Sequence, residues 1–158
     1  MTASTLRLTS TAFAENASIP AAYTCDGSGG NPPLSISGVP EGTQSLALVM
    51  RDIDVPKQFN TGGEFVHWVL FNMSPETTEI PETSAVGTPG SSGAGKPTYT
   101  APCPPPQYEP SEHRYVFDLY ALDTRLPLGE GVSKQQLLAA MEGHILAQTQ
   151  LAGKYRRK

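Results

Sequence analysis

The chain has 158 residues and a formal net charge of −4, and only 16% of its residues are charged. This length suits a single domain with a hydrophobic core, which we expect over residues 1–158. The weak negative charge argues against a general nucleic-acid or membrane-surface binder, because both need a basic face. No apolar run is long enough for a signal peptide or a membrane span, so we expect a soluble cytoplasmic protein.

Four segments show the composition of β-strands. The residues Thr5–Thr9 alternate, and Ser45–Met50 is apolar throughout. The segment Phe65–Phe71 is apolar on both faces, which is typical of a central strand covered on two sides. Arg114–Leu122 is rich in β-branched and aromatic residues. Between the last two strands, Pro75–Pro110 holds most of the prolines, and an irregular segment of this length is usually functional or mobile.

One helix is predicted near the C-terminus. Ser133 and Gln136 form the pattern of a capping box, and Gly153 is expected to end the helix. The basic residues from Lys154 to Lys158 would then lie at the negative end of the helix. The apolar residues at helical spacing are Leu137, Leu138, Met141, Ile145 and Leu146.

Several common signatures are missing or incomplete. The loop Gly90–Pro97, GSSGAGKP, is close to a phosphate-binding loop, but Pro97 replaces the hydroxyl residue, and neither a strand before it nor a helix after it is predicted. The pattern G-x-S-x-G is absent, as are C-x-x-C and H-E-x-x-H. Cys25 and Cys103 could form one disulfide, but without an export signal we expect reduced thiols.

Polar residues interrupt the apolar faces of three predicted strands. Because side chains alternate along a strand, each of these residues is expected to share a face with apolar neighbours. Burying such groups is costly unless each finds a partner, and gathering them in one pocket would satisfy them together. The expected faces are Asp52 and Asp54 with Leu46, Leu48 and Met50; His67 with Phe65, Val69 and Phe71; and His113 and Tyr115 with Phe117, Leu119 and Ala121.

The chain resembles the phosphatidylethanolamine-binding protein family, also called Raf-kinase-inhibitor-like proteins, in its bacterial and archaeal branch. The resemblance rests on motifs that run almost end to end: IPAAYTCDGSGGNPPL, VPEGTQSLALVMRDIDVP, VHWVLFNM, APCPPP, HRYVFDLYALD and GHILAQTQLAGKYRR. It implies a mainly β fold, in which a large central antiparallel sheet is flanked by a smaller sheet and a few helices, with the C-terminal helix packed on the side. It also implies a small surface pocket for phosphate or phosphorylated head groups.

The family's pocket motifs fall on defined positions of this chain. Its D-P-D-x-P motif falls on the segment from Asp52 to Pro56, with a cis Val55–Pro56 bond expected, and its G-x-H-R-Y motif falls on the segment from His113 to Tyr115. Its proline-rich pocket wall falls on the segment from Cys103 to Pro105. The ligand-binding residues implied are Asp52, Asp54, Pro56, His67, Cys103, Pro104, His113 and Tyr115.

Two departures from the family pattern concern the pocket rim. Ile53 stands where the family has proline, and the glycine that usually precedes H-R-Y is missing. The segment before His113 is also several residues longer than expected. We expect this change to reshape the rim, with Tyr108 and Glu109 placed to cover or narrow the mouth.

A carboxylate in an anion pocket requires an explanation, because like charges repel. In one arrangement Asp52 accepts a hydrogen bond from a histidine ring, and His67 and His113 supply the positive charge, so anion affinity should fall as pH rises. In the other, Asp52 and Asp54 meet the cationic or hydroxyl part of a zwitterionic head group. Asp54 could instead cap backbone donors.

Three functions are compatible with these residues. The first is a binding module for a small anionic or phosphorylated ligand, with no cofactor, acting as a regulator or inhibitor of a kinase or protease. The second is a hydrolase that uses the Asp/His cluster, for which Cys103 is the only candidate nucleophile. The third is a zinc or iron(II) site made of two histidines and a carboxylate. The resemblance also suggests a homodimer.

Overall fold

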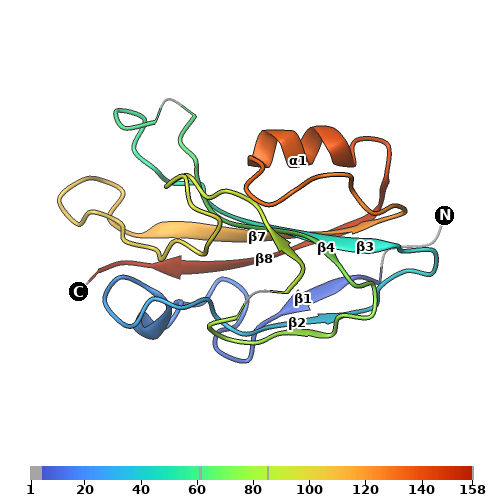
Figure 1. The fold of residues 1–158 in the computed structure, drawn as a ribbon. Helices are drawn as coiled ribbons and strands as arrows, with labels where there is room; N and C mark the ends of the chain where they lie inside the picture. The colour runs from blue at the N-terminus through green and yellow to red at the C-terminus, as the bar shows by residue number, and fades with distance from the viewer. Residues whose placement is uncertain (1–4, 61, 85, 158) are drawn as a thin grey trace.

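Two antiparallel sheets and one α-helix make up the fold of the computed structural model, which describes residues 5–60, 62–84 and 86–157 (Figure 1). The smaller sheet has the strand order β1-β2-β5, and the larger has the order β6-β4-β3-β7-β8. The smaller sheet comprises β1 (Arg7–Thr9), β2 (Leu34–Ser37) and β5 (Glu79–Ile80). The larger comprises β6 (Thr88–Pro89), β4 (Phe65–Met73), β3 (Ser45–Asp52), β7 (His113–Leu122) and β8 (Ile145–Tyr155). The helices are the 3-10 turn η1 (Ala21–Tyr23) and α1 (Lys134–Met141).

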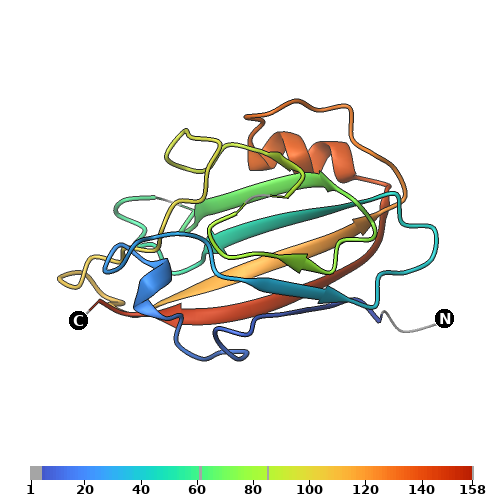
Figure 2. The same cartoon turned by 60° about the horizontal axis from the view of Figure 1, so that its bottom comes forward.

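The elements form three layers. Figures 1 and 2 show α1 on one face of the large sheet and the small sheet on the other. The period of two in β3 explains why both faces are covered, since Leu46, Leu48 and Met50 pack into the core that includes the small sheet. Ala47 and Val49 pack on the helix side. This arrangement confirms the predicted mainly β fold, with a large central antiparallel sheet and a smaller flanking one.

The predicted C-terminal helix is correct only in its first part. The capping box of Ser133 and Gln136 is present, but α1 ends at Met141. Gly143 follows with φ +81°, a left-handed conformation that commonly stops a helix. Ile145–Tyr155 then forms β8, which pairs with β7 along its whole length, and α1 packs on the large sheet through Leu137 and Met141. Pairing with β7 provides this segment with backbone partners that a sequence period cannot reveal.

Gly153, expected to end a helix, instead lies inside β8 opposite Tyr115. A Cβ atom at this position would lie 2.7 Å from Cγ1 of Ile19 and 2.9 Å from the ring of Phe13. The glycine therefore lets the N-terminal segment pack closely on the sheet. The basic tail does not lie at a helix end either, since Lys154 belongs to β8, and Lys158 lies outside the described residues.

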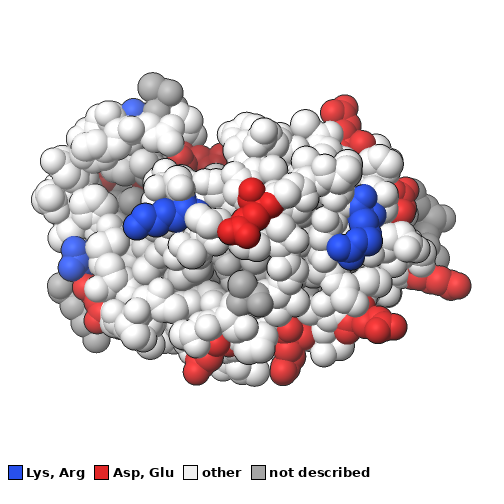
Figure 3. All heavy atoms as spheres, viewed as in Figure 1, with Lys and Arg blue, Asp and Glu red and all other residues white. Residues whose placement is uncertain are grey.

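The other predicted strands are confirmed, with boundaries shifted by up to two residues. The segment Pro75–Pro110 is largely irregular, but it contains the two-residue strands β5 and β6. Gly90–Pro97 is a loop with no helix after it, so it does not form a phosphate-binding loop. Of the helices in the described ranges, none has the length and apolar character needed to cross a membrane. On the face in Figure 3, basic side chains stand apart, with acidic ones along the lower edge.

Candidate functional site

A cavity of about 320 Å³ lies at the end of the large sheet where β3 ends and β4 and β7 begin, the left end in Figure 1. Most of its wall is apolar, with one acid and two histidines among the lining residues. Asp54 and Tyr115, both predicted as site residues, do not line it. The lining residues are Asp52, Val55, Pro56, Phe59, Phe65, His67, Thr100, Ala101, Cys103, Pro104, Pro105 and His113.

Asp52 and His113 form a buried pair at the base of the cavity. Asp52 lies at the end of β3, next to the start of β7, and the two side chains are 5% and 2% exposed. The Nδ1–H of His113 donates to Oδ2 of Asp52 at 2.6 Å, and the backbone N–H of Asp54 donates to Oδ1 at 2.8 Å. Both carboxylate oxygens are therefore occupied. The Nε2 atom of His113 is buried and has no hydrogen-bond partner among the described residues.

His67 reaches the cavity because β4 is irregular at this residue. Met50 pairs with Trp68, whereas the next residue, Arg51, pairs with Val66, so His67 is the extra residue of a β-bulge. Bulges re-aim side chains and are common beside functional sites. The prediction that His67 shares a face with Val69 and Phe71 is thus wrong, since those two pack on the helix side. The bulge turns His67 to the other face, where its ring contacts that of Tyr115.

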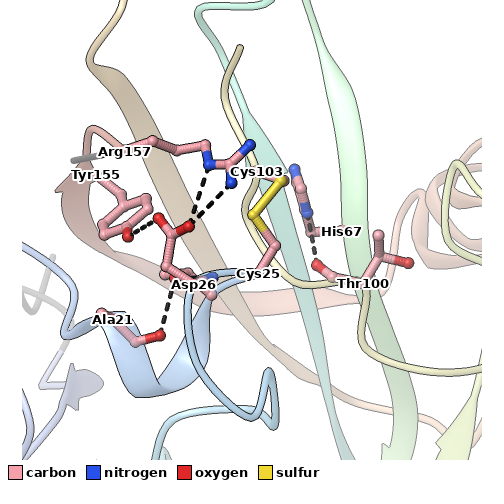
Figure 4. Close-up of a disulfide and its surroundings, with 9 residues drawn as sticks. Ala21, Cys25, Asp26, His67, Thr100, Cys103, Tyr155 and Arg157 are labelled. Carbon is pink, nitrogen blue, oxygen red and sulfur yellow. Dashed lines mark hydrogen bonds and ion pairs between the residues drawn. A yellow bond between two sulfur atoms is a disulfide. The ribbon is translucent and has the colours of Figure 1, made fainter. Parts of the chain in front are cut away.

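The hydrogen bond of His67 determines its tautomer. Its Nδ1 lies 2.6 Å from the backbone oxygen of Thr100, and because a carbonyl only accepts, Nδ1 carries the proton (Figure 4). Burial lowers the pKa of His67 below its ordinary value of 6.5, opposed by the Thr100 hydrogen bond and the charge of Asp52. The neutral ring therefore has its lone pair on Nε2, which makes no hydrogen bond to any described residue.

Tyr115 supports both histidine rings from beneath the cavity. Its ring centroid lies 5.3 Å from that of His67, edge to face, and 6.4 Å from that of His113, stacked. Its hydroxyl is buried without a hydrogen-bond partner among the described residues, and burial raises its pKa. The side chain predicted to line the pocket therefore positions the two imidazoles instead.

Asp54 belongs to the surface beside the cavity. Its carboxylate accepts from the backbone N–H of Arg114 and from the guanidinium Nε and Nη2 of the same residue, each at 2.8 Å. The side-chain hydrogen bond from Arg114 is the main cause that lowers the pKa of Asp54. Each oxygen of both acids therefore already accepts at least one hydrogen bond from the protein. Asp54 instead ties the turn after β3 to the start of β7.

The two cysteines are bonded to each other, so the expectation of reduced thiols is wrong. The disulfide joins the loop after η1 to Cys103 in the cavity wall, across 78 residues of sequence. Next to Cys25, Asp26 accepts from Tyr155 and Arg157, which ties the same loop to the end of β8 (Figure 4). Cys103 therefore offers no thiolate nucleophile in this state.

The mouth of the cavity is apolar, and it differs from expectation in the positions of Tyr108 and Glu109 and in the cis peptide bond. Tyr108 packs edge to face on Phe59, with ring centroids 4.8 Å apart, so it supports the rim without lining the cavity. Glu109 does not line it either. In the described residues the cis bond is Glu109–Pro110, so the predicted cis Val55–Pro56 bond is wrong.

Several cavity residues were absent from the predicted set. Thr100 acts through its backbone oxygen, so no sequence pattern identifies it. Phe59 lies in a loop, where an apolar residue has no periodic neighbour to indicate its direction, whereas Phe65 begins β4 and was predicted to share the face of His67 but was not named as a site residue. Within residues 5–60, 62–84 and 86–157, no group of three or more His, Cys, Asp or Glu residues is arranged to hold a metal ion.

A two-sheet β fold with a histidine-lined cavity at one sheet end is therefore the class of protein that the structure defines. A family model described as phosphatidylethanolamine-binding protein matches residues 9–156. The chain belongs to this family.

Relatives of similar length come from bacteria and archaea. A UPF0098 protein of Chlamydia pneumoniae is 44% identical over 151 residues, covering 95% of this chain and 98% of the relative. One from Methanothermobacter thermautotrophicus is 42% identical over 159 residues, with 96% and 99% covered.

Two solved structures share the fold. The phosphatidylethanolamine-binding protein homologue CT736 from Chlamydia trachomatis superposes with a TM-score of 0.93, 41% identity and coverage of 99% of this chain and 100% of that one. Escherichia coli YbcL, described as a new member of the mammalian phosphatidylethanolamine-binding protein family, superposes with a TM-score of 0.85 and coverage of 97% of this chain and 99% of that one. At 24% identity this second likeness shows the fold alone.

Proposed function

We propose that this protein binds a small anionic or phosphorylated ligand in the cavity formed by Asp52, His67 and His113. The observation that carries the proposal is the buried Nε2 of His113, which has no partner among the described residues. An unpaired buried polar atom costs roughly 1–3 kcal/mol, and a ligand oxygen in the cavity would relieve that cost. The ligand group is small, because the cavity volume of about 320 Å³ suits a head group.

The role of Asp52 resolves the problem of a carboxylate in an anion site. Both of its oxygens accept hydrogen bonds from protein groups, so the charge is directed at His113 and the backbone of Asp54 and away from the ligand. The pair also orients the ring of His113, because its Nδ1–H points to Oδ2 of Asp52. In this proposal, His113 presents an N–H group to the ligand.

The apolar wall indicates what is attached to the anionic group. Phe59 is 55% exposed at the mouth and packs on Tyr108, which is 37% exposed. Val55, Pro56 and Phe65 continue this surface into the cavity. An organic phosphate with a short apolar portion would fill both parts of the site, as the head-group region of a phospholipid would.

The family resemblance also predicts that the protein regulates a kinase or protease, and this stays a prediction. The hydrolase alternative has lost its candidate nucleophile, because the sulfur of Cys103 is bonded to Cys25. Assays with ester and phosphoester substrates would separate it from ligand binding, since the binding proposal predicts no turnover.

Isothermal titration calorimetry with methyl phosphate at pH 6 tests the proposal. We expect Asp52→Asn to lower the affinity at least tenfold, because the amide lacks the negative charge that pairs with the ring of His113. The matched control is Asp118→Asn, which changes a carboxylate of similar burial on the other face of the same sheet. Equal affinities of the wild type and Asp52→Asn, or equal losses in both variants, would contradict the proposal.

A further inference from the structure

The two histidines of the cavity differ in what their free nitrogens can do. Nδ1 of each is occupied, by the carbonyl of Thr100 for His67 and by the carboxylate of Asp52 for His113. A carbonyl oxygen stabilises an imidazolium much less than a carboxylate does. His67 therefore offers an acceptor at Nε2, whereas His113, paired with an acid, offers a donor.

We propose that the cavity selects oxyanions that carry one proton, such as the monoanion of a phosphate monoester. In the bound state an unprotonated ligand oxygen accepts from Nε2–H of His113, and the ligand's own O–H donates to Nε2 of His67. This inference rests on the proposed function and adds the protonation state of the ligand. A fully deprotonated oxyanion would face the lone pair of His67, and that contact is repulsive.

Burial favours the neutral form of His67, and the charged groups around the ring act in both directions. Asp52 faces it from β3, His113 and Tyr115 face it from β7, and the Asp54–Arg114 pair lies beyond them. The wall from Thr100 to Pro105 adds no titrating group, because Cys103 is in the disulfide. Burial, the largest effect, lowers the pKa of His67 and exceeds the opposite effects of the Thr100 hydrogen bond and the charge of Asp52, while the charge of His113 acts in the same direction as burial. The proton in the hydrogen bond between the ligand and Nε2 of His67 is therefore supplied by the ligand.

Methyl phosphate and methyl sulfate form a matched pair of probes. At pH 5.5 both are mainly monoanions of the same shape, but only the phosphate monoester, whose second pKa is about 6, retains an O–H group. In calorimetric titrations we expect methyl phosphate to bind at least about tenfold more tightly, because methyl sulfate places an oxygen without a proton against the Nε2 lone pair of His67.

The pH dependence provides the second criterion. The monoanion of methyl phosphate declines toward tenfold per pH unit above about pH 6, so its apparent affinity should fall at that rate up to pH 8. Methyl sulfate keeps its charge over this range, and its weak affinity should change less. Equal affinities with parallel declines would mean that His67 takes up the proton, and would overturn the inference. Tighter binding of methyl phosphate at high pH would also overturn it.

Two further measurements locate the effect on His67. In His67→Gln, the side-chain amide can present either a donor or an acceptor, so the preference for methyl phosphate should shrink to within about threefold. If this variant does not fold, the ring ¹⁵N chemical shifts of the wild type give the same answer. We expect His67 to keep an unprotonated Nε2 in the methyl phosphate complex, and a protonated Nε2 would refute the inference.

The outcomes also separate the inference from the proposed function. If neither ester binds at any pH from 5.5 to 8, the anion site itself is wrong, and the selectivity is wrong with it. If both bind to the cavity without discrimination, the anion site stands and only the selection for a protonated ligand fails.

Discussion

Each face of the large sheet holds one buried carboxylate. The two faces differ in whether all the polar atoms around that carboxylate have hydrogen-bond partners. On the helix side, Asp118 accepts from Nε of Arg51 and from Nε2 of Gln150, each at 2.7 Å. We call these three residues the helix-side cluster. On the other face, the pocket cluster consists of Asp52, His67, His113 and Tyr115.

Burial alone does not distinguish these clusters. Asp118 is 5% exposed and Asp52 is 4% exposed, and each has both oxygens occupied. The difference lies in the residues around the carboxylates. In the described residues, the buried side-chain atoms without a hydrogen-bond partner are Nε2 of His113 and the hydroxyl of Tyr115, and both belong to the pocket cluster. A satisfied buried network stabilises the fold, whereas the unpaired atoms of the pocket cluster are the basis of the proposed ligand site.

The largest expected effect on stability comes from the disulfide, which lies on the pocket side of the large sheet and contributes Cys103 to the cavity wall. Replacing both cysteines, Cys25→Ser with Cys103→Ser, should lower the free energy of unfolding by about 4 kcal/mol, because the bond closes a long loop of the unfolded chain. Binding of methyl phosphate should also weaken, since Cys103 lines the cavity. Denaturant unfolding followed by fluorescence measures the first effect. An unchanged midpoint in the double variant would show that the bond contributes nothing to stability.

A smaller effect is expected from the helix-side cluster. Asp118→Ala leaves Arg51 and Gln150 without their shared acceptor, and we expect a loss of about 2–3 kcal/mol in the free energy of unfolding. The value lies at the low end for a buried pair because the Arg51 side chain is 27% exposed. Methyl phosphate affinity should stay within about twofold of the wild type. A large loss of affinity would show that the two faces are not independent.

The smallest effect is a dependence of stability on pH. Because the pKa of His67 is lowered in the folded state, the unfolded chain binds more protons as pH falls below about 6.5, and stability decreases. The slope from this residue is at most about 1.4 kcal/mol per pH unit. The pKa of Asp54 is also lowered, because its ionised form is stabilised in the folded protein. Its contribution to stability is therefore present above pH 3.8 and is lost only in stronger acid.

This dependence can be isolated with His67→Gln. Denaturant unfolding of the wild type and the variant at pH 5, 6 and 7 should give a shallower dependence in the variant. Identical slopes would mean that His67 is not held neutral in the folded protein.

The sequence predicted the core more fully than the site. The period of two in Ser45–Met50 predicts the two buried faces of β3, because alternation depends on local geometry alone. His67 was predicted to lie at the site, but it was predicted on the same face as Val69 and Phe71, which is wrong because the bulge in β4 depends on the pairing partner. β8 was read as helix for the same reason, since its partner β7 lies far away in the sequence.

Of the eight ligand-binding residues that the family motifs implied, six line the cavity, but the motifs did not predict their contacts. These six are Asp52, Pro56, His67, Cys103, Pro104 and His113. The tautomer of His67 depends on a backbone oxygen of Thr100, and backbone groups carry no residue signature. Whether the cysteines were bonded depended on their separation in space, with Cα atoms 5.4 Å apart. These features arise from tertiary packing, which residue patterns do not encode directly.

A crystal structure of the protein with methyl phosphate bound tests the central claim most directly. The account predicts that the phosphate group lies in the cavity, with one oxygen within hydrogen-bond distance of Nε2 of His113 and another within the same distance of Nε2 of His67. A phosphate group bound elsewhere on the surface, with the cavity left as it is now, would contradict it.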